Sequence, residues 1–230
     1  TIFRYRVTIF VLMLFLSQRF LFPTENGAGI DEKLGKKIET EVVLFNEKGE
    51  KISLNSILTK PTIFLFVYYN CPGVCNPLMA EVAGLIDKID LIPGKEYQLV
   101  SVSIDETEDF GVAASKKINY FNAIKKRIPD SAWHFLTSDK ENIEKITESV
   151  GFRFFRDRDQ IIHPGALVFV NTDGLITRYL PGTTFLPFDI KMAVIETSQG
   201  KVTPTVAKLL KFCYKYDPDG RQYVLNITQI

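Results

Sequence analysis

Two cysteines separated by three residues, Cys71 and Cys75, stand out in the stretch NCPGVCNP. Thiols this close can cycle between a dithiol and a disulfide, bind a soft metal ion, or serve as structural thiols or a permanent disulfide. The spacing is unusual, since redox motifs normally place two residues between the cysteines and structural zinc sites use two pairs of ligands. The pair alone therefore leaves its chemistry open.

The surrounding pattern predicts where this pair lies. An apolar run, TIFLFVYY (62–69), precedes Cys71, and apolar residues at three- and four-residue steps follow over 76–91. Functional groups in open α/β sheets gather where strands end, and a helix N-terminus lowers the pKa of a thiol. We expect Cys71 near the helix cap and Cys75 one turn later, with both sulfur atoms on one helical face.

A metal site made by two thiolates needs a third ligand, and the chain has two histidines. Two thiolates and an imidazole suit Cu(I) and also Zn(II). His134 lies inside the strand-like run SAWHFLT, where a core or surface histidine is expected. His163 lies in a loop before a strand-like run, from which it can reach the edge of the sheet. The residues alone fit His163 either as a ligand or as a structural side chain.

The composition restricts the class of protein. A length of 230 residues favours one domain, or one domain with tails, and 46% hydrophobic with 24% charged residues is ordinary for a globular chain. The net charge of +1 lacks the basic excess typical of nucleic-acid-binding proteins, so no nucleic-acid partner is expected. Three cysteines are too few for a disulfide-stapled scaffold.

The N-terminal segment predicts export. Residues 1–23 contain two early arginines and the apolar run VTIFVLMLFL, which is typical of a signal peptide or an uncleaved membrane anchor. The run is short for a membrane span, which takes about 20 residues. A buried helix is the alternative. Export places the remaining chain in the periplasm or on the outer face of the cytoplasmic membrane, attached to the membrane through this segment.

The rest of the chain is predicted to be an α/β sandwich with a mixed sheet. Residues 24–35 are interpreted as a tether, 36–200 as the folded domain, and 201–230 as a C-terminal helix and tail. A hairpin is expected around Asn46–Gly49. Strand-like runs cover 62–69, 97–104, 133–137, 166–170 and 174–180, and helical patterns cover 76–91, 110–127, 139–150, 187–197 and 203–213.

Taken together, the sequence resembles the Sco/SenC family, thioredoxin-like copper proteins that serve cytochrome c oxidase assembly. The resemblance rests on VYYNCPGVCNP, VSVSIDETED, WHFLTSD and IIHPGALVFVNTDGLITRYLPG, which follow the family's order over about residues 36–200. It implies a thioredoxin-like sandwich with a mixed central β-sheet, an N-terminal hairpin extension and flanking helices. It also implies that Cys71, Cys75 and His163 bind a copper ion, and that Cys71 and Cys75 form a redox-active pair. Asp105 matches an acidic residue near the copper site and would support the ligands without binding the ion.

The function implied by the resemblance is that of a copper metallochaperone. It would deliver copper to the copper-bearing subunit of a respiratory oxidase, or act as the thiol-disulfide reductant that prepares the binuclear copper site of that subunit. The alternative is a thioredoxin- or peroxiredoxin-like thiol oxidoreductase without metal delivery, which would not need His163. A third interpretation is a membrane-linked interaction module with an inert disulfide. Dependence of activity on His163 separates the first hypothesis from the other two.

Three features depart from the family pattern or lie outside it. Asn76 directly follows the second cysteine, where the family often has proline. Pro164 follows His163, where many members have a small residue. A cis-proline precedes this strand in thioredoxin-like folds, and one interpretation is that Pro164 corresponds to it, although most X–Pro bonds are trans. Cys213 lies in the tail and is expected to be a packed thiol in a helix rather than a ligand.

Overall fold

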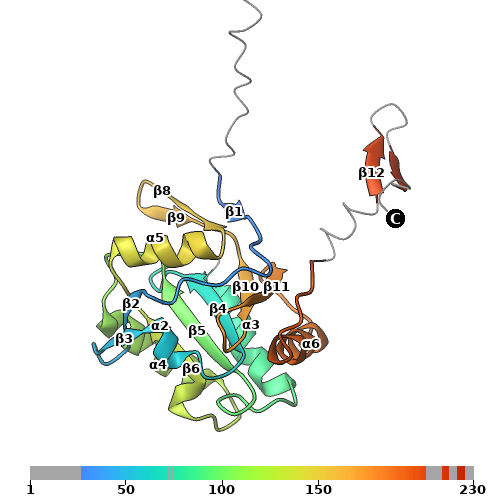
Figure 1. Cartoon of the computed structure of the whole chain (residues 1–230). Helices are drawn as coiled ribbons and strands as arrows, with labels where there is room; N and C mark the ends of the chain where they lie inside the picture. Colours follow the sequence, from blue (N-terminus) through green and yellow to red (C-terminus); the bar gives the residue numbers. More distant parts are fainter. Residues whose placement is uncertain (1–26, 72, 74, 206–213, 218–221, 226–230) are drawn as a thin grey trace, which may run out of the picture.

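The computed structural model describes residues 27–205 except 72 and 74, together with the backbone of 214–217 and 222–225 (Figure 1). The predictions for residues 1–23 and for Cys213 lie outside the described residues. Within the described part of the chain, no helix is long and apolar enough to cross a membrane.

A five-stranded mixed sheet forms the centre of the fold, in the order β11-β10-β4-β5-β6. The strands β4, β5 and β6 are parallel, and β10 runs antiparallel to both β4 and β11. This arrangement confirms the predicted α/β class with a mixed sheet. The strand bounds are Thr62–Val67 for β4, Gln98–Ser103 for β5, Trp133–Leu136 for β6, Ala166–Val170 for β10 and Ile176–Pro181 for β11.

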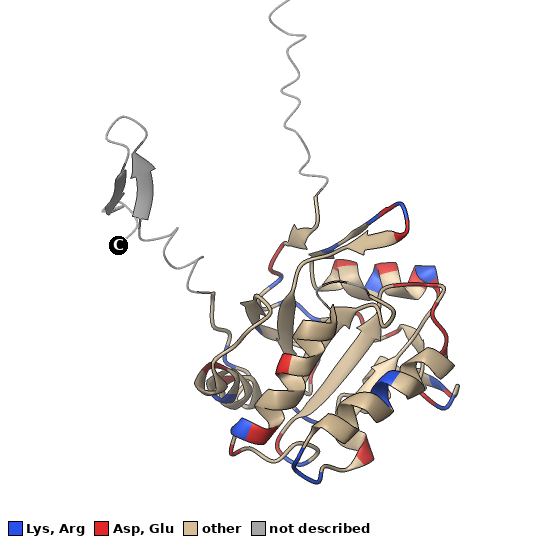
Figure 2. Ribbon diagram, turned by 180° about the vertical axis from the view of Figure 1, so that it is seen from behind, with Lys and Arg blue, Asp and Glu red and all other residues tan. Residues whose placement is uncertain are grey.

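The interior strands are uncharged because elements cover both faces of the sheet. Every residue of β4, β5 and β10 is buried, and none is charged, whereas charged residues of both signs occupy helices and loops (Figure 2). Strands buried on both faces are continuous rather than alternating apolar runs. For this reason the apolar runs in the sequence predicted the strands well.

Four main helices surround the sheet (Figure 1): α3 (Cys75–Lys88), α4 (Phe110–Ala123), α5 (Lys140–Ser149) and α6 (Pro187–Ser198), with the short α2 (Leu54–Ile57) and the 3-10 turn η1 (Asp130–Ala132). α3 packs beside α4, α4 packs on β6, and α6 packs on β10 and β11. The Asp109 and Asp139 carboxylates accept N–H groups of the first turns of α4 and α5, which starts each helix at a defined residue.

Two helices end earlier than the sequence pattern predicts. α3 ends at Lys88 and α4 at Ala123, instead of at residues 91 and 127. Beyond α4, the Asp87 carboxylate accepts the backbone N–H groups of Lys125 and Lys126, so a contact from another helix replaces helical hydrogen bonds there. The helix predicted over 203–213 does not include residues 203–205, and its remainder lies outside the described residues.

Short antiparallel strand pairs are found outside the five-stranded sheet. β2 (Val43–Phe45) and β3 (Lys51–Ser53) form the predicted N-terminal hairpin. β8 (Phe155–Asp157) pairs with β9 (Gln160–Ile162), and β12 (Tyr214–Asp217) pairs with β13 (Gln222–Leu225). β1 (Gly29–Ile30), inside the stretch interpreted as a tether, pairs with β7 (Phe152–Arg153), so this part of the stretch is bound to the domain.

Candidate metal and thiol site

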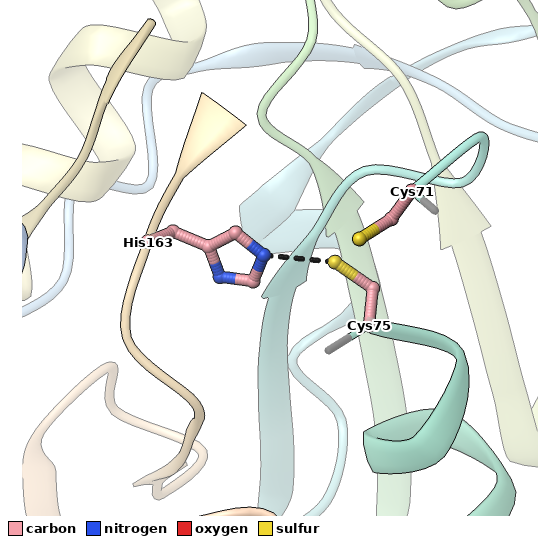
Figure 3. A group of neighbouring side chains, drawn as sticks. All are labelled: Cys71, Cys75 and His163. Carbon is pink, nitrogen blue, oxygen red and sulfur yellow. Dashed lines mark hydrogen bonds between the residues drawn. The ribbon is translucent and has the colours of Figure 1, made fainter. Parts of the chain in front are cut away.

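Three potential ligands converge at one end of the sheet (Figure 3). Cys71 lies in the loop after β4, Cys75 is the first residue of α3, and His163 directly follows β9. Their donor atoms all lie within 4.8 Å of one another, and the Cys75 Sγ is 2.8 Å from the His163 Nε2. The side chains are buried, with 4%, 1% and 9% of their residues' surface exposed. The structure thus brings together three residues that the sequence had singled out.

The cysteines reach this pocket by a different route from the one predicted. α3 begins at Cys75, so Cys71 precedes the helix by four residues, and the prediction of one shared helical face is wrong. A folded loop replaces the helical turn. In it, the Cys71 N–H donates to the Tyr68 carbonyl, and the Asn76 side-chain amide donates to the Cys71 carbonyl at 3.0 Å. The non-helical placement of Cys71 follows from these side-chain and loop hydrogen bonds.

The two free thiols have opposite pKa shifts. Burial alone would raise the pKa of Cys71, but hydrogen bonds from Cys75, from the Tyr68 side chain and from the Gly73 N–H lower it below its ordinary value. Burial raises the pKa of Cys75 strongly, and the neighbouring Cys71 raises it further. Cys71 is therefore the thiol that ionises first, and it is the better nucleophile of the pair near neutral pH.

The histidine presents one nitrogen to the cysteines. The His163 Nδ1 lies 3.0 Å from the Pro164 carbonyl, which can only accept a hydrogen bond, so Nδ1 carries the proton in the neutral ring. Nε2 then has a free lone pair directed at Cys75. Burial lowers the pKa of His163, which keeps the ring neutral and able to bind a metal. The His163–Pro164 peptide bond is trans, so Pro164 does not reproduce the cis-proline feature.

Asp105 connects the end of β5 to the hairpin that precedes His163. Its carboxylate accepts hydrogen bonds from the Thr107 N–H and hydroxyl, and it pairs with Arg156 of β8 at 2.9 Å. Burial would raise the pKa of Asp105, but the Thr107 and Arg156 contacts lower it below its ordinary value. These contacts are with the loop and the hairpin rather than with the cysteines, and a role near copper stays a prediction.

Sequence reasoning missed Glu108. This buried carboxylate accepts the N–H groups of Tyr69 and Asn70, the two residues before Cys71, and also the Ser103 hydroxyl. The only signal in the sequence is an acidic residue between an apolar strand and a helix. The other histidine, His134, lies half-buried on the edge strand β6 and is not one of the clustered ligands.

Comparisons with known proteins agree with this arrangement. The sequence profile of the SCO1/SenC family matches residues 30–197. A SCO1 protein homolog of Bacillus subtilis is 24% identical over 170 residues, which cover 71% of this chain and 83% of that protein.

Two solved structures share the fold. The copper-bound structure of ScoI from Arabidopsis thaliana has a TM-score of 0.57 at 17% identity, over 69% of this chain and 96% of its own. BsSco, described as a Sco-family cytochrome c oxidase assembly protein with a disulfide switch, has a TM-score of 0.56 at 24% identity, over 75% of this chain and 99% of its own. These likenesses confirm the predicted thioredoxin-like architecture.

Proposed function

The chain belongs to the SCO1/SenC family, and we propose that it is a copper metallochaperone that delivers copper to the binuclear site of a respiratory cytochrome c oxidase. In this proposal Cys71, Cys75 and His163 hold one copper ion as cargo. The partner is the copper-bearing subunit of the oxidase, as the relation of BsSco to oxidase assembly suggests.

One observation carries the proposal: two cysteine thiols and an imidazole from separate parts of the chain converge within 4.8 Å. Ligands about 2.0–2.3 Å from a shared ion lie roughly 3.5–4 Å apart, so small side-chain movements would let all three bind. Two soft sulfur ligands with one imidazole favour Cu(I) over hard cations. Three protein ligands also leave one side of the ion open, where thiolates of a partner can enter and take the ion by ligand exchange.

The unequal thiols favour a second role, reduction of the partner's own cysteines before copper enters. The Cys71 thiolate would attack a partner disulfide, forming a mixed disulfide and releasing one partner thiolate. Cys75 would then attack the Cys71 sulfur, release the second partner thiolate and close the Cys71–Cys75 disulfide. Two electrons pass from this pair to the partner. An oxidised pair cannot bind copper, so the two roles alternate in one molecule.

Copper binding after anaerobic reduction tests the proposal. We expect one copper per chain in the parent and almost none in Cys71→Ser or Cys75→Ser, because each loses a thiolate. His163→Ala should bind copper weakly yet still form the disulfide, because both sulfur atoms remain. Stoichiometry and thiolate-to-copper absorption give the readout.

His134→Ala is the matched control, because it removes the other histidine and should leave copper binding unchanged. A His163 variant that binds copper like the parent, beside a His134 variant that does not, would refute the choice of the third ligand. A parent that retains no copper would leave the thiol oxidoreductase as the better hypothesis.

We also propose that the domain acts outside the cytoplasm, held at the membrane by residues 1–23. The support is the basic and apolar pattern of that segment. Protease added to intact cells or spheroplasts should digest the domain, whereas protection of the domain would contradict export.

A further inference from the structure

The buried carboxylate of Glu108 lies outside the ligand set but is bonded to the loop that carries Cys71. Its Oε2 accepts the Tyr69 N–H at 2.7 Å, and its Oε1 accepts the Asn70 N–H at 2.6 Å. The Ser103 hydroxyl donates to Oε2 at 2.6 Å. Only 7% of Glu108 is exposed, so water competes little for these bonds. Both carboxylate oxygens are thus used to hold neighbouring backbone.

This carboxylate fixes the chain immediately before Cys71. Hydrogen bonds to an ionised acceptor are shorter and stronger than those between neutral groups. The Tyr69 hydroxyl lies 3.1 Å from the Ser101 carbonyl and 3.0 Å from the Leu136 carbonyl, so this residue is held at its backbone and at the end of its side chain. Cys71 follows two residues later, and its path out of β4 is set by these contacts.

Because Cys71 lies before α3, its position depends on the loop and on the hydrogen bond from the Asn76 amide to its carbonyl. Cys75 is fixed by α3 and His163 by the end of β9, whereas Cys71 lies on neither element. We propose that Glu108 is a positioning residue, which holds the 69–71 loop so that the Cys71 sulfur meets the other two ligands. This inference rests on the proposed copper-binding function and deepens it.

Neighbouring acidic residues provide matched controls because they make different contacts. Glu106 is exposed and lies 3.5 Å from Arg156. Asp109 caps α4 by accepting the N–H groups of Gly111 and Val112. Among Glu106, Glu108 and Asp109, Glu108 is the residue whose side chain accepts hydrogen bonds from the cysteine loop.

The test compares Glu108→Gln with Glu106→Gln and Asp109→Ala in the whole protein. Glutamine keeps the size of glutamate but directs an N–H₂ group at one of the loop N–H groups, so one loop bond is lost. Changes to residues that support metal ligands typically weaken metal affinity 10–100-fold. We therefore expect Glu108→Gln to bind one copper with about 10–100-fold lower affinity and with an altered thiolate-to-copper absorption band.

The controls separate positioning from a merely structural role. Asp109→Ala removes the cap of α4, so it should lower the thermal unfolding temperature yet keep the copper affinity and absorption band of the parent. Glu106→Gln should leave the unfolding temperature, the affinity and the absorption band nearly unchanged. A folded Glu108→Gln variant with parental affinity and absorption would overturn the inference while leaving the copper proposal intact. A parent without copper would overturn the proposed function itself. If Glu108→Gln does not fold, Glu108→Asp is tested by copper affinity and by the absorption band in the same way. Aspartate keeps the charge but is one methylene too short to reach both loop N–H groups, so parental values would overturn the inference.

Discussion

Asp105→Asn should destabilise the protein at neutral pH and lose this effect in acid. The Asp105 carboxylate pairs with Arg156 at 2.9 Å, and the two side chains are 12% and 41% exposed. Exposed ion pairs contribute about 0.2–1 kcal/mol, whereas hydrogen bonds to charged groups contribute about 1.5–3 kcal/mol. Since one partner is buried and the other is half in water, we expect a loss of about 1–2 kcal/mol. Asparagine keeps the shape of the side chain and an oxygen that can accept the hydrogen bonds from Thr107, so the substitution removes mainly the charge.

The lowered pKa of Asp105 determines how its contribution to stability changes with pH. The pKa of Asp105 is lowered in the folded protein by its contacts with Thr107 and Arg156, which outweigh burial. A lowered carboxyl pKa contributes stability above the unfolded value, about 3.9 for Asp, and this stability is lost as the pH falls through the folded pKa. The difference between the parent and Asp105→Asn should therefore be full at pH 7 and shrink below about pH 4.

Urea unfolding followed by tryptophan fluorescence measures this difference. Trp133 is the only tryptophan in the sequence and is fully buried, so its emission reports unfolding of the sheet. Glu106→Gln is the control, because that carboxylate is 40% exposed and 3.5 Å from the same guanidinium, and it should cost less than about 0.5 kcal/mol. A difference for Asp105→Asn that is absent at pH 7, or equally large at pH 7 and pH 3, would refute the reasoning.

Two further predictions follow from the thiol pKa values and from backbone geometry. In the reduced protein at pH 7, iodoacetamide should modify Cys71 well before Cys75, because each unit of pKa separation changes the thiolate fraction about tenfold; peptide mass spectrometry that finds equal labelling would contradict the assigned shifts. Gly151→Ala should lower the free energy of unfolding by about 2 kcal/mol or more, because Gly151 has φ +65° and an added Cβ would lie 1.9 Å from the Asp31 carbonyl oxygen. Gly84→Ala, in open space inside α3, should instead raise the free energy of unfolding by about 0.5–1 kcal/mol. Urea unfolding in which Gly151→Ala stabilises the protein, or Gly84→Ala destabilises it, would show that backbone conformation does not decide these effects.

The sequence predicted the central strands because their signal is local. The run 166–170 coincides with β10 residue for residue, since both faces of that strand are covered and all its side chains are apolar. Hairpin β8–β9 was missed because its strands are only three residues long and largely exposed. Its turn also places Arg158 at φ 54°, where a sequence reader looks for glycine or asparagine.

The three candidate ligands could be predicted from the sequence, but the contacts that hold them in place could not. Cys71, Cys75 and His163 carry a recognisable spacing and chemistry. The bonds of Glu108 to Tyr69 and Asn70 join residues 39 and 38 positions apart, and no periodicity encodes such a pairing. Long-range hydrogen bonds of this kind appear only once the sheet brings the ends of β4 and β5 side by side.

The short segment after β5 connects both halves of the site. One half is the cysteine loop, which Glu108 holds through two backbone N–H groups. The other is the hairpin before His163, which Asp105 holds through Arg156. Because the ligands come from elements 88 residues apart, their spacing depends on such shared anchors rather than on either element alone. The thiol pair would need only the first anchor to form a disulfide, whereas the proposed three-ligand copper site would need both, so the two proposed activities would have different structural requirements.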